Sequence, residues 1–528
     1  MAQNNTKFIN NKYLQKDIVE YRLYQEVLSI GAINKNTLVV APTGLGKTII
    51  AILLISYIYA KNKNVILLSP TKPLITQHYK SLQKTLNISL DNMFLLTGTI
   101  SANKRKEIYT KKGIIICATP QTIRNDLNNN LIDTTNVNLL VFDEAHRSTG
   151  NYAYCDVSNH FPQDIRRLAL TASPGSKRSK INEVAENLKI EEIEIKNETD
   201  LDVVDYIKEV EVEIKLLELD LNSKRISRLL DIYIMKKIEF LQKLNFKINS
   251  NYSKKQLLEI QKYLFVKVKN STNKFLFLGI STIAGIIKVL HAKELIESQG
   301  FYAFEKYIHK LFLDHKNKPS RSLSQFINSK ELTKVLEILN ISKNEIEYSK
   351  EKELKIMAVD FLNKNPNSKI LVFNNFRDNA NYLTEKLNKI NLISAKRFVG
   401  QANKSGDKGL SQKEQALVIK DFKENKYNVL VCTSVGEEGL DIPSVDLVIF
   451  YDAVASEIRN IQRRGRTGRF ESGKVIVLIN KDTIDEKYYF VSKNKEEKMK
   501  KLLTNFTYKP SVNKSKTLKS SQKGLFDF

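Results

Sequence analysis

The sequence predicts an α/β protein with two doubly wound parallel-sheet lobes and a mainly helical insert between them. Short apolar runs that lead into polar turns alternate with amphipathic stretches in two separate blocks of the chain. This is the pattern of parallel sheets covered by helices. The segment between the blocks, 175–368, is far longer than the ~2–6 residues that connect elements of α/β units. The length of 528 residues also fits several domains of ~100–200 residues each.

The first block opens with a strand and continues with further short apolar runs. Because open α/β sheets bind ligands beyond the carboxyl ends of their strands, the residues after each run are candidates for function. The expected strands are Thr37–Val40, Asn64–Ser69, Met93–Leu96, Gly113–Ala118, Leu139–Phe142 and Arg167–Leu170.

The first strand leads into a phosphate-binding loop, APTGLGKT at 41–48. Gly44 and Gly46 let the backbone curl so that its N–H groups point at phosphate oxygens. Lys47 would reach the β- and γ-phosphates, and the Thr48 hydroxyl would ligate Mg²⁺. The helix that follows turns its positive N-terminus towards the same anion. The nucleotide is expected to contact Ala41, Pro42, Thr43, Gly44, Leu45, Gly46, Lys47 and Thr48, where Ala41 stands at the usual first glycine.

The strand at 139–142 delivers two adjacent carboxylates, Asp143 and Glu144, to its carboxyl end. Asp143 can hold Mg²⁺ through water while Glu144 orients and activates the attacking water, which is what hydrolysis of a nucleoside triphosphate requires. The four letters DEAH alone are a weak signal. Together with the phosphate loop they predict ATP and Mg²⁺ as cofactors.

The second block repeats the alternation and supplies arginines. Four arginines fall within QRRGRTGR at 462–469, and some of them would neutralise transition-state charge on a lobe that faces the phosphate loop. The alternative is a solvated basic face, which the fixed glycines Gly465 and Gly468 disfavour. The expected strands are Lys369–Phe373, Ser394–Phe398, Val429–Cys432, Leu447–Phe450 and Lys474–Leu478.

In their order along the chain these motifs resemble those of superfamily-2 helicases. Four longer strings narrow the resemblance to the archaeal Hef helicase and its eukaryotic relative, the Fanconi-anaemia complementation-group M translocase. It extends over nearly the whole chain, to about Lys493. The strings are DEAHRSTGNYAY at 143–154, HAKELIESQG at 291–300, RFVGQANKSGDKGLSQKEQ at 397–415 and TSVGEEGLDIP at 433–443.

The resemblance implies two RecA-like lobes and assigns roles to further residues. Arg22 and Gln25 are similar to an adenine-reading Q-motif, and His146, Gly439 and Asp441 fall in nucleotide-binding motifs. Arg466 and Arg469 would act on the γ-phosphate, with Gln462 sensing it. The DNA-contacting motifs would contribute Pro70, Thr71, Lys72, Thr97, Gly98, Thr119, Pro120, Gln121, Arg377 and Thr433.

The segment between the lobes begins with an alternating strand at 209–214 and then becomes helical. From Asp220 onwards its apolar residues follow the i, i+3, i+4, i+7 spacing of an amphipathic helix. Residues 221–300 carry 15 basic and 5 acidic side chains. The resemblance implies a thumb-like domain that grips branched DNA, with Lys224, Arg225 and Arg228 as candidate contacts. A helical spacer with a lysine-covered surface is the alternative.

The C-terminal residues predict a basic tail with a clamp-binding motif. Seven Lys and one Asp lie in 500–528. The final QKGLFDF resembles the motif that docks into PCNA-type sliding clamps, with Gln522, Leu525, Phe526 and Phe528 as the contacts. Packing of these apolar residues on the second lobe is the alternative. Because the sequence stops at Phe528, we expect no nuclease module of the Hef type, and strand cleavage would need a separate nuclease.

Composition favours a polyanionic partner and disfavours several classes of protein. The formal net charge is +26, which promotes association with nucleic acid through counterion release. The three cysteines show no paired spacing, so neither a disulfide framework nor a zinc site is expected. The uncharged apolar runs 48–60 and 275–287 are shorter than a membrane span. We expect a soluble, cytoplasmic protein without a membrane partner, and the resemblance implies that it is associated with the nucleoid of an archaeal cell.

The expected domains are residues 1–218 for the first lobe, 219–350 for the insert, 351–497 for the second lobe and 498–528 for the tail. The expected function is that of an ATP-dependent DNA helicase or translocase on stalled forks and Holliday junctions in repair and recombination, with 3′→5′ polarity and a clamp tether. One alternative is an RNA-directed ATPase of the Dicer and RIG-I type, which carries an insert in the same place. Another is a clamp-tethered DNA-binding scaffold.

Overall fold

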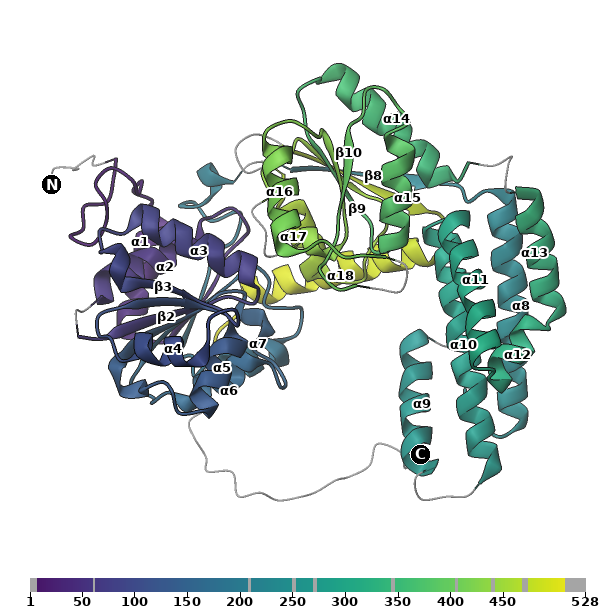
Figure 1. Cartoon of the computed structure of the whole chain (residues 1–528), viewed down its shortest axis with the longest axis horizontal. Helices are drawn as coiled ribbons and strands as arrows, with labels where there is room; N and C mark the ends of the chain where they lie inside the picture. The colour runs from purple at the N-terminus through teal and green to yellow at the C-terminus, as the bar shows by residue number, and fades with distance from the viewer. Residues whose placement is uncertain are drawn as a thin grey trace. The chain divides into compact units, whose positions relative to one another are not determined.

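The computed structural model describes residues 7–59, 62–207, 210–248, 253–268, 273–342, 347–403, 407–437, 442–467 and 473–508. The chain forms two compact units (Figure 1), one of residues Met1–Ile207 with Glu497–Phe528 and one of residues Lys208–Glu496. The Gly439, Asp441, Arg469, Gln522, Leu525, Phe526 and Phe528 sites predicted above lie outside the described residues.

The first unit is built on a seven-stranded sheet in the order β3-β4-β2-β5-β6-β1-β7. All of its neighbouring strands pair in parallel, so the predicted doubly wound fold is confirmed. The edge strand β7 is absent from the predicted set because its Glu192-Ile-Glu-Ile195 sequence is only half-buried. The strands are β1 (Thr37–Val40), β2 (Asn64–Leu68), β3 (Met93–Leu96), β4 (Ile115–Ala118), β5 (Val137–Phe142), β6 (Arg166–Thr171) and β7 (Glu192–Ile195).

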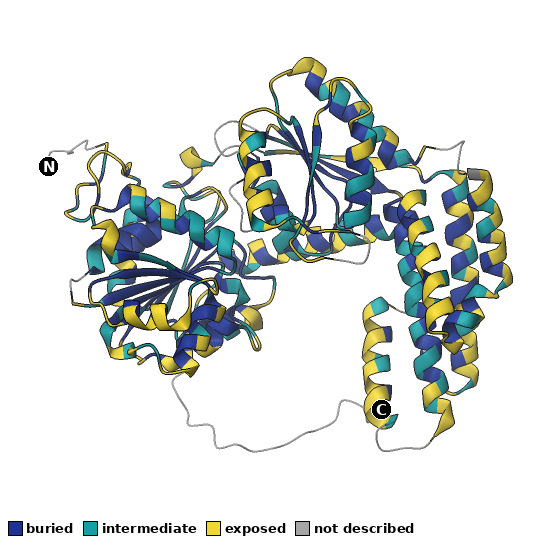
Figure 2. Ribbon diagram, in the orientation of Figure 1, coloured by how far each residue is buried: buried dark blue, intermediate teal, exposed yellow. Residues whose placement is uncertain are grey.

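Helices cover both faces of this sheet (Figure 1). The helix after the phosphate loop, α2 (Lys47–Ile58), is buried over most of its length, because its run IIAILLIS is apolar on all sides. The exposed surfaces of the unit lie on the outer helices (Figure 2). These are α1 (Leu23–Asn34), α3 (Lys72–Thr85), α4 (Ala102–Tyr109), α5 (Pro120–Asn128), α6 (Ala153–His160) and α7 (Arg178–Asn187).

The second unit contains a six-stranded parallel sheet in the order β10-β11-β9-β12-β13-β8. Its edge strand β8 corrects one expectation. The expected bounds of the first lobe, residues 1–218, include the strand near 209–214, whereas all eight residues of β8 pair with β13 and so belong to the second sheet. The strands are β8 (Val210–Leu217), β9 (Ile370–Phe373), β10 (Ala395–Phe398), β11 (Val429–Cys432), β12 (Leu447–Phe450) and β13 (Gly473–Asn480). Helices α14 (Ser349–Lys364), α15 (Arg377–Leu387), α16 (Gln412–Lys423) and α17 (Glu457–Arg464) follow within the unit, and α18 (Ile484–Thr504) runs across the boundary between the units.

The helices between β8 and α14 form a bundle with a core of its own. Its central helix α10 packs on α8, α9, α11 and α12. By length and composition α10 could cross a membrane, which the apolar run 275–287 alone does not suggest. In the bundle its side chains Ile283, Ile286 and Val289 are fully buried in that core. The helices are α8 (Leu221–Lys243), α9 (Lys254–Val268), α10 (Lys274–Ser298), α11 (Phe301–Asn317), α12 (Arg321–Ile327) and α13 (Lys330–Ser342).

Candidate active site

The loop between β1 and α2 has the curled backbone that the sequence predicts. Gly44 and Gly46 adopt φ angles of 90° and 70°, a region that favours glycine. The Lys47 ammonium folds back over the loop, with its Nζ 3.0 Å from the carbonyl oxygens of both Ala41 and Pro42. The loop therefore presents an ammonium and a helix N-terminus at the same place, as a phosphate site needs.

Helix α1 is fastened to this loop through its first turn. Tyr24 Oη and Gln25 Nε2 both donate to the carbonyl oxygen of Leu45, at 2.9 and 3.0 Å. Both side chains are buried. The predicted adenine-reading Gln25 thus contacts the phosphate loop itself. Arg22 lies over the ring of Tyr206, with 4.6 Å from its guanidinium carbon to the ring centroid.

Replacing Gly46 with Ala is expected to lower ATP affinity by about tenfold. A Cβ at this position would lie 2.6 Å from the buried Gln25 Nε2, and φ is positive, a strain of roughly 1–3 kcal/mol for a residue other than glycine. Equilibrium binding of a fluorescent ATP analogue measures the effect. Gly31→Ala on α1 is the control, because nothing lies within 4 Å of a Cβ there and Ala favours a helix. Equal affinity of both variants would show that the loop tolerates a side chain.

The Asp143 carboxylate is held at the carboxyl end of β5 by two side chains. His78 Nε2 lies 2.8 Å from Asp143 Oδ2, and Ser69 Oγ donates to the same oxygen at 3.3 Å. Burial would raise the pKa of Asp143, but the interaction with His78 and the charge of Lys47 outweigh it and place this pKa below its usual value. These interactions favour the ionised form of Asp143. The Tyr154 hydroxyl donates to its carbonyl oxygen at 2.7 Å.

Glu144 adopts a left-handed conformation with φ 50°, which is uncommon outside glycine and concentrates at functional sites. His146 Nδ1 lies 3.3 Å from the Glu144 carboxylate and 3.0 Å from Thr171 Oγ1. Thr171, the last residue of β6, also accepts a hydrogen bond from the Ser173 backbone N–H at 3.2 Å. His146 thus connects the acid pair to the turn after the neighbouring strand.

The strand order explains why these residues meet. Because β5, β6 and β1 are neighbours in a parallel sheet, Asp143, Thr171 and the phosphate loop follow three adjacent carboxyl ends. Thr48 and Asp143 provide oxygen donors of the kind that Mg²⁺ prefers. Among the residues that the structure describes, no group of three or more His, Cys, Asp or Glu side chains could hold a metal ion. This donor set suits an Mg²⁺ ion that keeps most of its water and phosphate ligands.

Three residues that hold the side chains of this site are not among those assigned a role from the sequence. His78 and Ser69 hold Asp143, and Thr171 holds His146. Ser69 and Thr171 stand at or beside strand ends, where such residues could be sought. His78 gives no signal of its own, because it lies in the middle of α3 and reaches Asp143 only through the packing of that helix.

Arg459, Arg463 and Arg466 of the second unit are gathered around Glu437. Arg459 Nε donates to one carboxylate oxygen and Arg463 Nε to the other, both at 2.7 Å. Arg466 Nη2 donates to the backbone carbonyl oxygen of Glu437 at 2.6 Å. Arg463 is fully buried, against the rings of Phe373 and Phe450. The sequence analysis names Arg466 and misses Glu437 and Arg459 as its neighbours.

Gln462 lies on α17 within the same run, and its side chain is buried. A salt bridge of 2.5 Å joins Arg464 on this helix to Glu496 on α18. The arginine-rich run therefore separates into buried members that surround Glu437 and an outer member that pairs with another helix.

The predicted DNA-contacting residues of the first unit follow three neighbouring strands. Thr71, Thr97 and Thr119 come directly or closely after β2, β3 and β4, so they lie along one edge of the sheet. Thr71 caps α3 by accepting a hydrogen bond from the Leu74 backbone N–H at 3.4 Å. The other members of this set are Pro70, Lys72, Gly98, Pro120 and Gln121.

In the second unit, Arg377 and Thr433 follow the neighbouring strands β9 and β11. Arg377 forms an ion pair of 3.0 Å with Asp407. Of the basic residues predicted on the insert, Arg225 and Arg228 are exposed on α8, and Lys224 pairs with Glu218 at 2.7 Å.

Three family models match the chain in order. Residues 22–181 match the model described as "DEAD/DEAH box helicase" and residues 349–471 match "Helicase conserved C-terminal domain". Residues 222–346, the bundle, match "Putative ATP-dependent RNA helicase, helical bundle". The matches cover β1 to β6 of the first sheet, β9 to β12 of the second sheet and the bundle between them.

Two curated relatives are similar over most of this chain. A Methanocaldococcus jannaschii protein named "Putative ATP-dependent RNA helicase" is 41% identical over 95% of this chain and 63% of its own length. An Arabidopsis thaliana protein named "DEAD-box ATP-dependent RNA helicase FANCM" is 34% identical over 87% of this chain and 35% of its own. The chain thus spans less than two thirds of either relative.

One solved structure is matched over its entire length. The crystal structure of the Pyrococcus furiosus Hef helicase domain shares 38% sequence identity with this chain and superposes with a TM-score of 0.70. The alignment covers 91% of this chain and 100% of the crystallised one. The likeness therefore includes both sheets and the bundle.

Proposed function

Because the chain belongs to the Hef and Fanconi-anaemia group M family of superfamily-2 helicases, we propose that it is an ATP-dependent motor that remodels branched DNA in repair and recombination. The observation that carries this proposal is the buried Asp143, which His78 and Ser69 hold at the same carboxyl edge of the sheet as the phosphate loop. A residue with a fixed charge at a strand end, beside an ammonium, suits phosphoryl chemistry.

We assign the chemical roles as follows. Lys47 binds the β- and γ-phosphates, and Thr48 and Asp143 hold Mg²⁺, Asp143 through water. Bound Mg²⁺ would neutralise phosphate charge. Glu144 orients the attacking water and accepts its proton. Gln462, Arg466 and Arg469 belong to the same reaction as groups that contact the γ-phosphate. Arg22, Gln25, His146, Gly439 and Asp441 complete the nucleotide site.

The nucleic-acid path is assigned to the residues beyond the carboxyl ends of β2, β3, β4, β9 and β11, together with the basic face of α8. We propose DNA as the substrate because fungal relatives at 31–33% identity are named ATP-dependent DNA helicases. The runner-up is RNA, because the bundle model and the M. jannaschii relative carry RNA-helicase names. Stimulation of ATP hydrolysis by a DNA fork, with duplex RNA as competitor, tests the choice. Stronger stimulation by the RNA would reject the DNA assignment.

Neutralising Lys224, Arg225 and Arg228 together is expected to weaken binding to forked DNA and to reduce its salt dependence. Each lost phosphate contact should lower the slope of log affinity against log salt by about one. Fluorescence anisotropy with a labelled fork at several salt concentrations measures this slope. The control is Lys236→Ala with Lys237→Ala, because these lysines pair with Glu331 and Gln325 of other bundle helices, whereas Arg225 and Arg228 of the test set are exposed on α8. If both sets change the slope equally, the predicted face of α8 is not the DNA contact.

We also propose that the C-terminal QKGLFDF tethers the motor to a PCNA-type clamp, in a nucleoid-associated protein that works with a separate nuclease and moves 3′→5′. A peptide of residues 519–528 should bind the clamp weakly, because a flexible segment must be ordered on docking. Replacing Leu525 and Phe528 with Ala should abolish binding, since each anchor contributes roughly 1.5–3 kcal/mol of burial. Calorimetry with the isolated peptide measures it. If no heat of binding is detected at high micromolar clamp concentrations, the proposed clamp tether is wrong.

A further inference from the structure

The bundle joins the second lobe at the C-terminal end of α10, where the string HAKELIESQG lies. Tyr348 Oη and Asn480 Nδ2 both donate to the carbonyl oxygen of Glu297, at 2.7 and 2.8 Å. Gly300 follows with φ +91°, and a Cβ there would lie 2.7 Å from the Tyr348 ring. The end of α10 is therefore fitted closely to the lobe.

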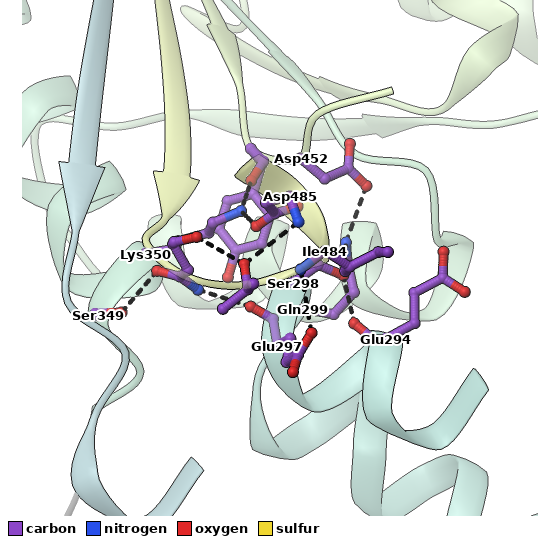
Figure 3. Close-up of polar contacts among 12 residues, drawn as sticks. Glu294, Glu297, Ser298, Gln299, Ser349, Lys350, Asp452, Ile484 and Asp485 are labelled. Carbon is purple, nitrogen blue, oxygen red and sulfur yellow. Dashed lines mark hydrogen bonds and ion pairs between the residues drawn. The ribbon is translucent and has the colours of Figure 1, made fainter. Parts of the chain in front are cut away.

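Gln299 uses both ends of its amide at this joint. Its Nε2 donates to Asp452 Oδ2 at 2.9 Å, and its Oε1 accepts from Asn374 Nδ2 at 2.7 Å and from Asn379 Nδ2 at 2.9 Å. All four side chains are buried. Figure 3 shows Gln299 pointing from the end of α10 towards Asp452. A buried group left without such partners is costly, so this arrangement fixes the two parts together.

The hydrogen bonds continue from Asp452 towards the arginines. Asp452 Oδ2 also accepts from the Asn375 backbone N–H at 2.8 Å, and its carbonyl oxygen accepts from Arg463 Nη1 at 3.0 Å. Asn375 Oδ1 accepts from Arg459 Nη2 at 2.6 Å and from Arg463 Nη2 at 3.0 Å. A change in the position of Asp452 therefore reaches both guanidinium groups.

The last hydrogen bonds of this chain lead to Arg466, the arginine that is assigned to the γ-phosphate. Arg459 and Arg463 both bind the Glu437 carboxylate, and the Glu437 carbonyl oxygen accepts from Arg466. A chain of hydrogen bonds of 3.0 Å or less thus runs from Gln299, on the bundle, to Arg466, on the second lobe. The residues between them belong to the second lobe.

We propose that Gln299 is a positioning residue that couples the state of the helical bundle to the arginine cluster around Glu437. This inference rests on the proposed function, in which Arg466 acts in ATP hydrolysis. When nucleic acid binds the bundle, a displacement of the end of α10 is transmitted through Asp452 and Asn375 to the guanidinium groups of the arginine cluster. Displacements of about 1 Å at a catalytic group are enough to change turnover strongly.

The test replaces Gln299 with Leu, a side chain of similar size that makes no hydrogen bond. Fork-stimulated kcat is expected to fall about tenfold, the range that coupling residues away from either ligand produce. KM for ATP and the affinity for the fork should stay unchanged, because Gln299 is buried and contacts neither ligand site. Steady-state ATP hydrolysis, fork anisotropy and thermal melting are measured on the full chain.

A second variant, Gln299→Glu, keeps the acceptor for Asn374 and Asn379 but replaces the donor to Asp452 with a carboxylate oxygen, which repels the Asp452 carboxylate and breaks that contact. It should show the same fall in kcat, and it serves as the test if the Leu variant does not fold. The matched control is Tyr348→Phe, which removes buried hydrogen bonds of the same joint but does not lead to the arginines. Its kcat should equal that of the wild type, even where its melting temperature falls as much.

Wild-type kcat in the Gln299 variants, or an equal fall in Tyr348→Phe, would overturn the coupling and leave a joint that is only structural. The same preparations separate this failure from that of the proposed function. If the fork does not stimulate hydrolysis by the wild type, the function itself is wrong and the coupling with it. If Lys47→Ala abolishes stimulated hydrolysis while Gln299→Leu is normal, only the coupling is wrong.

Discussion

Replacing Glu144 with Gln is expected to lower fork-stimulated ATP hydrolysis by ~10³-fold or more while Mg²⁺–ATP still binds. The amide cannot accept a proton from the attacking water, whereas Lys47, Thr48 and Asp143 are untouched. Gln has nearly the shape of Glu and can take the same left-handed backbone with φ 50°. Single-turnover hydrolysis and equilibrium nucleotide binding give the two quantities separately.

The companion variant Lys47→Ala should lose both ATP hydrolysis and nucleotide binding, because it removes the ammonium that is proposed to contact the phosphates. The contrast between the two variants is the informative result. Wild-type turnover in Glu144→Gln would contradict its role as the base, and lost binding in that variant would make it a ligand instead.

Replacing Arg466 with Lys is expected to slow hydrolysis by ~10³-fold with nucleotide affinity nearly unchanged, since an arginine that acts in the transition state supplies a factor of this size. Arg466 donates one N–H to the Glu437 carbonyl oxygen, and a planar guanidinium can bind a phosphate through two parallel N–H groups. A lysine ammonium cannot reproduce that fork.

The control is Arg464→Lys, two residues earlier in the same run. Arg464 pairs with Glu496 at 2.5 Å, and a lysine can keep such an ion pair. Its turnover should remain close to that of the wild type. If ATP affinity falls as much as turnover in Arg466→Lys, the transition-state assignment is wrong.

The sequence predicts a strand most clearly where both faces of that strand are buried. The runs that form β1, β2, β4 and β5 are apolar apart from Thr37, Asn64 and Asn138, because central strands of a parallel sheet are covered on both sides. The edge strand β7 carries alternating glutamates and shows no such run. The alternating pattern of β8 predicts a strand, but a pattern within one segment does not identify its pairing partner, which is β13 in the other sheet.

The residues of the candidate active site also divide into those that a local pattern predicts and those that only distant contacts bring together. The spacing of Gly44, Gly46, Lys47 and Thr48 is local, so it can be read from consecutive residues. The partners that hold the acid pair are distant in sequence: His78 reaches Asp143 across 65 positions, because α3 packs against the sheet over β3 and β4. No feature of the His78 neighbourhood in the sequence indicates this.

By itself, the sequence determined the two parallel sheets, the phosphate loop, the Asp143–Glu144 pair and the arginine-rich run, because each depends on spacing within a few consecutive residues. The tertiary structure alone decided that Glu437 gathers Arg459, Arg463 and Arg466, and that Gln299 of the bundle binds Asp452 of the lobe across 153 positions. These contacts form where separate elements pack together, and buried polar groups then take whichever partners the packing brings within reach.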